Sequence, residues 1–139
     1  MTPIELRCHK GIGPTVQGTA LVAEDNFSAR YDLDRDKGVF SRPAHKLHGQ
    51  SYVGKILVLN TAKGGVASAW MLREMNQRGL APKALVFNSV NPILAQGAAF
   101  ADLALVDRVE RGDVTRLFRT GDELLVDPQA GRVIILHRP

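Results

Sequence analysis

A glycine turn that carries a lysine lies where an apolar stretch gives way to a segment of helical character. Lys55–Asn60 reads KILVLN, the turn contains Lys63, Gly64 and Gly65, and residues 66–78 read VASAWMLREMNQR. The first backbone N–H groups of a helix are unpaired and carry partial positive charge, so a helix start of this kind attracts anions. The glycines allow close approach, and Lys63 adds an ammonium group. The sequence therefore predicts a carboxylate or phosphate site at the tip of this strand.

The turn does not match the known nucleotide motifs. Neither GxxxxGK[ST] nor GxGxxG is present, and a plain strand-to-helix connection stays open as the alternative to an anion site. Ser68 lies one helical turn beyond the glycines. Pairing of its hydroxyl with the sequence-remote His45 would suit nucleophilic catalysis, although serines near a helix start more often cap or pack.

Two other clusters contain residue types that bind metals. His45 and His48 lie in one loop, but no third ligand of suitable spacing accompanies them. Asp32, Asp34 and Asp36 alternate as in a calcium loop, yet the glycine and the glutamate of an EF-hand are out of place. We interpret the histidines as surface or hydrogen-bonded groups and the aspartates as a solvated turn, and we expect no metal site.

Composition indicates one domain that spans residues 1–139. Of these residues 45% are hydrophobic, which is enough for one buried core. The 18 Lys and Arg outnumber the 14 Asp and Glu, for a net charge of +4, but the basic residues are dispersed. This pattern does not favour nucleic-acid binding, and a mild positive field favours a small anionic substrate or an acidic partner.

Cys8 is the single cysteine, so the chain cannot build a disulfide or a thiolate-bound zinc or iron–sulfur site by itself. The N-terminal residues show no signal-peptide pattern, and no apolar run approaches the length of a membrane span. We therefore expect a cytoplasmic protein.

The arrangement of apolar stretches predicts a mixed α/β domain. Ile4–His9 and Val16–Ala23 are expected to pair as a hairpin, and the polar, turn-rich residues 24–49 are expected to line a site or meet a partner. A second hairpin is expected from Asp122–Asp127 and Arg132–His137.

Between the hairpins, the pattern predicts a parallel strand–helix–strand–helix–strand unit. In the helix at 66–78, the apolar stripe that contains Val66, Trp70 and Met75 is expected to pack on the sheet. Lys83–Asn88 and Leu103–Asp107 read as strands, and Asn91-Pro92 opens the helix between them.

Several short motifs then occur in a characteristic order along most of the chain. They are Asp34 with Gly38, His45 with Leu47, Gly49 and Gln50, Gly54-Lys55 with the following strand, Lys63-Gly64, Pro82 with Ala84, and the run PILAQGA from Pro92 to Ala98. The run PILAQGA and the strand GKILVLN are the most specific of these. In this order of motifs the chain resembles the swivel domain of the aconitase X family, in particular the small subunit of its two-chain members.

The resemblance implies a swivelling β/β/α domain of the aconitase type, with a mixed sheet or barrel and two or three helices. It also implies the function of one half of a hydro-lyase that dehydrates a small anionic hydroxy acid of the phosphomevalonate or cis-3-hydroxyproline type. In such enzymes a large subunit carries the iron–sulfur cluster, and this chain binds none, in agreement with the single Cys8.

The chain departs from the family where relatives have a proton-abstracting serine and an arginine, because Gly65 and Lys63 stand at those positions. Three explanations fit the sequence: Ser68 or Thr61 supplies the hydroxyl, a desolvated and neutral Lys63 is the base, or the substrate differs or is only bound. The predicted substrate-binding residues are Lys63, Gly64, Gly65, His45 and Asp34, the last two shaping the loop or a subunit contact.

Two other functions are compatible with the sequence. The first is a swivel module that binds an anion or docks on a protein without catalysis. The second is a phosphohistidine carrier with His45 as the phosphate acceptor, which is disfavoured because His45 lies in a polar, proline-containing loop away from the glycine turn.

Overall fold

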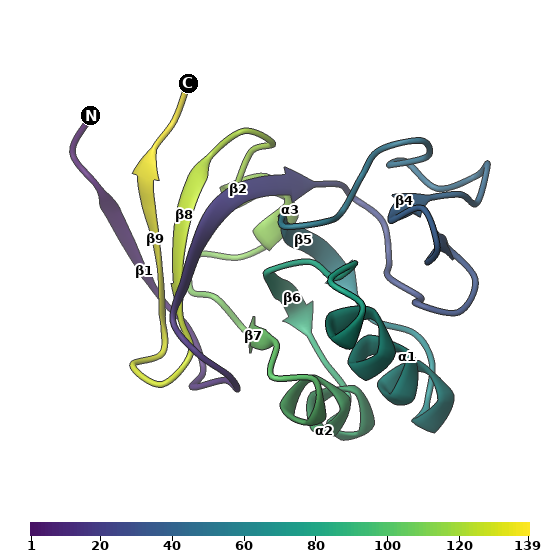
Figure 1. Ribbon diagram of the computed structural model, residues 1–139. Coiled ribbons are helices and arrows are strands. Elements are labelled where there is room, and N and C mark those ends of the chain that lie inside the picture. Colours follow the sequence, from purple (N-terminus) through teal and green to yellow (C-terminus); the bar gives the residue numbers. More distant parts are fainter.

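A mixed seven-stranded sheet runs through the protein, whose computed structural model describes residues 1–139 (Figure 1). The elements are β1 (Ile4–Arg7), β2 (Val16–Val22), β3 (Leu33–Asp34), β4 (Val39–Phe40), β5 (Ile56–Thr61), α1 (Val66–Gln77), β6 (Ala84–Ser89), α2 (Pro92–Phe100), β7 (Ala104–Asp107), α3 (Val114–Leu117), β8 (Glu123–Asp127) and β9 (Arg132–His137). The strand order is β1-β9-β8-β2-β5-β6-β7, with β3 and β4 as a separate pair.

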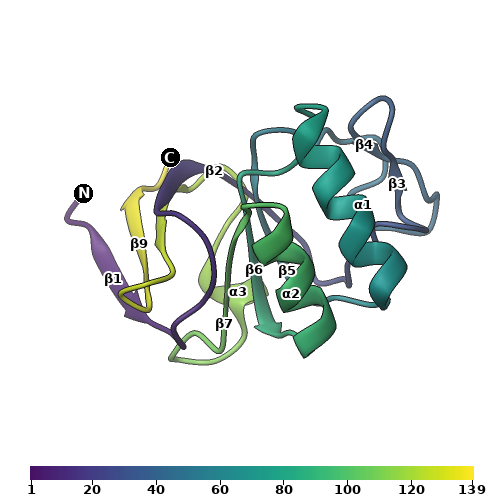
Figure 2. The same ribbon diagram turned by 60° about the horizontal axis from the view of Figure 1, so that its bottom comes forward.

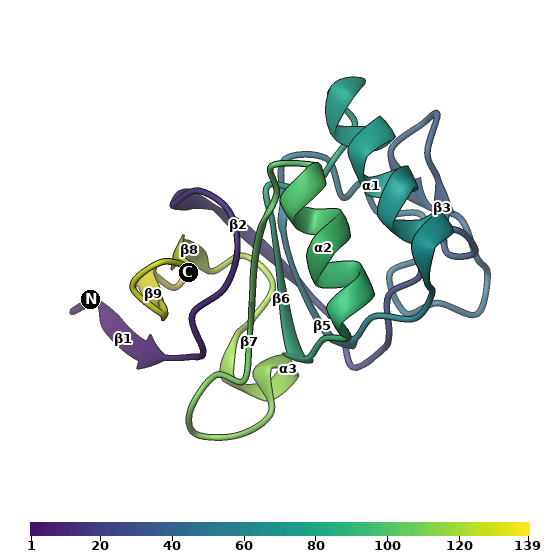
Figure 3. The same ribbon diagram turned by 90° about the horizontal axis from the view of Figure 1, so that it is seen from below.

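The predicted parallel centre of the sheet is confirmed, since β2, β5, β6 and β7 run parallel in adjacent positions. Strand β5 is buried on both faces, as expected for a parallel strand covered by helices. Leu57 and Leu59 face the core beneath α1 and α2, whereas Ile56 and Val58 face the core shared with α3. Figure 3 shows α1 and α2 together on one side of these strands and α3 on the other.

The antiparallel half differs from the predicted pairing at the N-terminus. Strands β8 and β9 form the expected hairpin, but β1 pairs with β9 in the register Ile4–Ile135, and β2 pairs with β8 and β5. The predicted hairpin between Ile4–His9 and Val16–Ala23 is therefore wrong. The sheet is open, with β1 and β7 at its edges, so the barrel alternative is also wrong.

Helix α1 buries a different face from the predicted one. Ser68, Leu72 and Met75 point inward at helical spacing, while Val66 and Trp70 are exposed. The prediction that Val66 and Trp70 pack on the sheet is wrong because α2 lies beside α1 and Gly97 of α2 packs directly on Ala69. None of the three helices combines the length and the apolar character needed to cross a membrane.

The polar residues 24–49 form a long excursion that contains the β3–β4 pair. Buried aromatic side chains fix it, since Phe27 packs on Phe87 of β6 and Phe40 packs edge-on against Tyr52. Figure 2 shows this excursion beside α1. The excursion therefore lies next to the glycine turn that joins β5 to α1.

Candidate functional site

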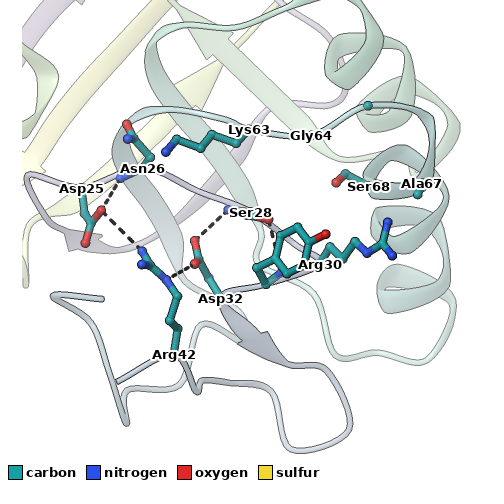
Figure 4. A pocket seen from close by; sticks show the side chains of 12 residues that line it. Asp25, Asn26, Ser28, Arg30, Asp32, Arg42, Lys63, Gly64, Ala67 and Ser68 are labelled. Carbon is teal, nitrogen blue, oxygen red and sulfur yellow. Dashed lines mark hydrogen bonds and ion pairs between the residues drawn. The ribbon is translucent and has the colours of Figure 1, made fainter. Parts of the chain in front are cut away.

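A pocket of about 460 Å³ opens between the β5–α1 turn and the polar excursion (Figure 4). The residues that line it are Asp25, Asn26, Ser28, Arg30, Tyr31, Asp32, Arg42, Lys63, Gly64, Gly65, Ala67 and Ser68. This volume lies in the range of small-molecule sites. The pocket also lies beyond the carboxyl end of a parallel strand, where open α/β sheets bind their ligands.

Backbone hydrogen bonds hold the two walls of the pocket together. The Phe27 N–H donates to the Thr61 carbonyl over 2.8 Å, and the Lys63 N–H donates to the Phe27 carbonyl over 2.7 Å. Because the Phe27 ring is fully buried, this contact is anchored in the core. Residues 25–32 are thereby fixed beside the turn, although more than thirty positions separate Phe27 from Lys63 in the sequence.

The turn leaves the start of α1 open to the pocket. Gly64 has a φ of +115°, a conformation that favours glycine, and Gly65 occupies the N-cap position without a side-chain cap. The N–H groups at the first helical positions, Val66 to Ser68, have no acceptor in the protein. Unpaired N–H groups at the positive end of a helix are suited to binding an anion.

Ser68 places its hydroxyl in the pocket from the first turn of α1 (Figure 4). Only 2% of the residue is exposed, although it lines the pocket. The oxygen also lies close to Gly64, where a Cβ atom would overlap it. A hydroxyl that faces the pocket beside an open helix start is a group that could bind substrate or exchange a proton.

Asp32 and Asp25 form an acidic wall of the pocket, and both carboxylates already accept hydrogen bonds from groups of the protein. Asp32 accepts from the Ser28 N–H over 2.9 Å and from Arg42 Nε over 2.6 Å. Burial acts to raise the pKa of Asp25, but the N–H groups of Lys46 and Asn26, with Arg42, hold that pKa below its usual value. Both carboxylates are therefore held in place by hydrogen bonds and brace the wall.

His45 lies one layer behind the wall and is buried. Its Nδ1 accepts from the Leu47 N–H over 3.0 Å, so Nε2 carries the hydrogen that it donates to the Asn26 carbonyl over 2.7 Å. The ring also stacks on Phe40, with 4.6 Å between ring centroids. Both ring nitrogens are engaged, which fits a role in shaping the loop and leaves no accessible nitrogen for a phosphate carrier.

The remaining predicted site residues divide between the pocket and its surroundings. Lys63, Gly64, Gly65 and Ser68 line the pocket together. Thr61 lies just outside, where its hydroxyl donates to the Ser89 carbonyl over 2.8 Å.

Asp34 also lies outside the pocket, in β3. Its carboxylate accepts from the N–H groups of Asp36 and Lys37, as in an Asx turn. The structure therefore gives Asp34 a role in shaping the loop.

Comparisons with known proteins agree with this arrangement. Residues 5–135 match the profile of the aconitase X swivel domain. The chain is 32% identical, over 95% of each sequence, to the phosphomevalonate dehydratase small subunit of Methanothrix thermoacetophila. It is 30% identical to the protein of the same name from Methanococcoides burtonii, over 99% of this chain and all of the relative.

The chain belongs to the aconitase X swivel-domain family. The crystal structure of Thermococcus kodakaraensis aconitase X in its holo-form contains a chain that superposes on it with a TM-score of 0.88 at 28% identity, over 96% of this chain and 99% of the other. The predicted family, the fold and the small-subunit role in a hydro-lyase are confirmed by these comparisons.

The single thiol of this aconitase X swivel domain lies outside the pocket. Cys8 is its single thiol, and burial, with the nearby Asp107 and Asp127, raises the pKa of Cys8 to about 11. Cys8 also follows the edge strand β1, away from the pocket (Figure 1). No three His, Cys, Asp or Glu side chains form a group that could hold a metal ion.

Sequence reasoning missed most of the residues that this swivel domain contributes from the excursion. They are Asp25, Asn26, Ser28, Arg30, Tyr31 and Arg42. The polar composition of residues 24–49 indicated a site-lining loop but did not indicate which side chains face the turn. The nearest local signal is Phe27, the large apolar residue at the start of the loop that anchors it to β5 and β6.

Proposed function

We propose that the substrate of this small subunit is phosphomevalonate or a closely similar phosphorylated hydroxy acid, and that dehydration occurs with a large subunit that carries an iron–sulfur cluster. The observation that carries the proposal is the match to phosphomevalonate dehydratase small subunits over nearly the whole of both sequences. The anion-binding pocket at the start of α1 supports it independently. We also propose that the complex is cytoplasmic.

Ser68 is the group that we assign to proton removal. Dehydration of a hydroxy acid breaks a C–H bond beside the carboxylate and a C–O bond on the next carbon, and a C=C bond forms between the two. In this assignment Ser68 accepts the proton as its alkoxide and becomes a hydroxyl, and the positive end of α1 favours the negative charge of the alkoxide. This chain supplies no group for the departing hydroxide.

The geometry ranks the other two candidates for the base below Ser68. The Thr61 hydroxyl is committed to the Ser89 carbonyl. Lys63 is exposed, whereas the hypothesis that it is the base requires a side chain removed from water. The Ser68 oxygen lies beside Gly64, so it reaches the turn where the family resemblance places a serine at Gly65.

Substrate binding is assigned to Lys63 and to the turn. The Lys63 ammonium attracts one anionic group, and the free N–H groups of the turn and of α1 donate to its oxygens. His45 and Asp34 act indirectly, His45 through its hydrogen bond to the Asn26 carbonyl and Asp34 through its turn.

A large-subunit partner accounts for an exposed apolar groove next to the pocket. Val66, Trp70, Ile93 and Phe100 form it between α1 and α2, and Trp70 and Phe100 are 59% and 67% exposed. Trp70 and Phe100 stack on each other with 6.1 Å between ring centroids. Val66 directly precedes Ala67 and Ser68 of the pocket, so a partner that closes the pocket also reaches this groove, and such patches are typical of protein interfaces.

A non-catalytic anion-binding module is the second candidate, because Gly65 stands where relatives have the serine. A single experiment separates the two functions. The chain is co-expressed with the large-subunit protein from the same genome, and loss of phosphomevalonate is measured for the complex and for each chain alone. We expect turnover only by the two-chain complex. A complex that forms but leaves phosphomevalonate unchanged would support the binding module.

A further inference from the structure

A chain of hydrogen-bonded asparagines runs along the carboxyl ends of the parallel strands. Its members are Asn88 in β6, Asn60 in β5 and Asn26 in the excursion. Asn88 Nδ2 donates to Asn60 Oδ1 over 3.0 Å, and Asn60 Nδ2 donates to Asn26 Oδ1 over 3.0 Å. Because Asn88 also bonds to the start of α3 and Asn26 lines the pocket, the chain connects α3 with the pocket wall.

The start of α3 fixes the direction of this chain. The Val114 N–H can only donate, and it donates to Asn88 Oδ1 over 2.9 Å. The Asp113 carboxylate accepts from Asn88 Nδ2 over 2.9 Å. Hydrogen bonds from Asn88 and Thr115 hold the pKa of Asp113 below its usual value, which keeps this carboxylate an acceptor. Asn88 therefore turns its nitrogen toward Asn60, which has to accept with its oxygen.

The same constraint passes on to Asn26. Because the Asn60 oxygen faces Asn88, the Asn60 nitrogen faces Asn26 and takes the Asn26 side-chain oxygen as its acceptor. The Asn26 amide nitrogen lies on the other branch of the same carbon, and Asn26 lines the pocket whereas Asn60 does not. The chain of asparagines thus presents an N–H donor to the pocket at Asn26.

Backbone contacts hold Asn26 close to Lys63. The Asn26 N–H donates to Asp25 Oδ1 over 2.8 Å, and the Asn26 carbonyl accepts from His45 Nε2 over 2.7 Å. The next residue, Phe27, accepts from the Lys63 N–H over 2.7 Å. Figure 4 shows the Lys63 side chain extending toward Asn26. An amide donor beside an ammonium group is suited to a negatively charged oxygen group, whose several lone pairs can accept from both.

We propose that the Asn26 amide donates a hydrogen bond to the anionic group that Lys63 attracts, and that Asn60 and Asn88 are positioning residues that hold this amide in its orientation. The inference rests on the proposed function and adds Asn26 as a substrate-binding residue. Asn60 lies outside the pocket, so it affects binding only through Asn26.

NMR titration of the isotope-labelled full chain with inorganic phosphate and, separately, with acetate tests the proposal. We expect the side-chain amide signals of Asn26 to shift with at least one of these anions, which identifies the group that is bound. The signals of Gln129, in the exposed turn between β8 and β9, are expected to stay unchanged. Asn26→Ala is expected to weaken binding of that anion at least about tenfold, on the scale of one hydrogen bond to a charged group.

A double-mutant cycle tests the positioning role of Asn60. Asn60→Ala is expected to weaken anion binding at least about threefold, and to cause no further loss beyond about twofold when it is added to Asn26→Ala. Asn60 is exposed, so the fold is expected to stay intact. Gln129→Ala removes an exposed amide far from the turn and is the matched control, which is expected to keep the wild-type affinity.

The outcomes distinguish this inference from the proposed function. Asn26 signals that respond to neither anion overturn the inference even if the two-chain complex dehydrates phosphomevalonate. Losses that add up in the double variant overturn the positioning role of Asn60. An Asn26 response with non-additive losses, in a chain whose complex leaves phosphomevalonate unchanged, supports the inference and contradicts the proposed substrate.

Discussion

At the scale of single residues, the site depends on two adjacent glycines, Gly64 and Gly65, which differ in backbone conformation and surroundings. Gly64 has a φ of +115°, and a Cβ atom there would overlap the Ser68 hydroxyl. Gly65 has a φ of −127°, and a Cβ atom there meets nothing within 4 Å. Gly64 is therefore the more tightly constrained of the two positions.

This difference predicts opposite results for a matched pair of variants. Gly64→Ala is expected to lower the free energy of unfolding by about 1–3 kcal/mol because of backbone strain and the displaced Ser68. Gly65→Ala is expected to change it by less than about 0.5 kcal/mol. Urea denaturation of the purified chain measures both, and equal losses would contradict our account of the turn.

At the scale of elements, a buried ion pair ties the end of β9 to the region of α3. Asp122 is fully buried and accepts from Arg138 over 2.8 and 2.9 Å, and Arg138 also donates to the Leu117 carbonyl. Burial acts to raise the pKa of Asp122, but Arg138 and the Arg119 N–H outweigh it and hold that pKa below its usual value.

This pair predicts a pH-dependent contribution to stability. Since the folded-state pKa of Asp122 is lowered, its stabilisation is present above the unfolded value, about pH 4, and is lost as the pH falls through the folded value. Asp122→Asn is expected to cost about 2–4 kcal/mol near neutral pH, because Arg138 loses its charged partner. Chemical denaturation of both proteins as a function of pH should show the difference narrowing below about pH 4. A difference independent of pH would argue against the pair.

The groove between α1 and α2 gives a second prediction at this scale. Trp70→Ser is expected to leave the fold intact, because the side chain is 59% exposed, and to weaken association with the large subunit at least about tenfold. Ile4→Ser on the edge strand β1 is the control, since it also removes an exposed apolar side chain, away from the pocket. The affinity of each variant for the large subunit is measured by titration of the labelled chain. Equal affinities for both variants would exclude the groove from the subunit interface.

Elements with local signals were predicted well from the sequence, and those that depend on distant partners were not. Asn91 and Pro92 indicated the start of α2, and the Asn91 side chain does accept from the Leu94 N–H. The partner of β1 lies at the far end of the chain, and no local pattern indicates that Ile4 pairs with Ile135.

The same division applies to the site. The turn with Lys63 and Gly64 was found because its residues are contiguous. Arg30 and Arg42 were missed because contacts between distant segments bring them to the pocket: the backbone of Phe27 bonds to the turn, and Arg42 bonds to Asp32. Asp32 and Asp34 share one polar pattern, yet only Asp32 lines the pocket.

At the scale of the whole molecule, the sheet divides the protein into a supporting half and a site-bearing half. The antiparallel strands β1, β9 and β8 lie at one side, and the parallel strands with α1, α2 and the excursion lie at the other (Figure 1). The pocket and the apolar groove both lie in the second half and share the first turn of α1. This arrangement places the pocket and the groove side by side, where one large subunit could cover both.

The kcat of the two-chain complex that contains Ser68→Ala tests the central claim most directly. If the Ser68 alkoxide accepts the substrate proton, kcat for phosphomevalonate is expected to fall at least about a hundredfold in this variant, while KM and subunit association stay close to wild type. A Ser68→Ala complex that turns over within twofold of the wild-type kcat would contradict the claim that this pocket performs the proton transfer.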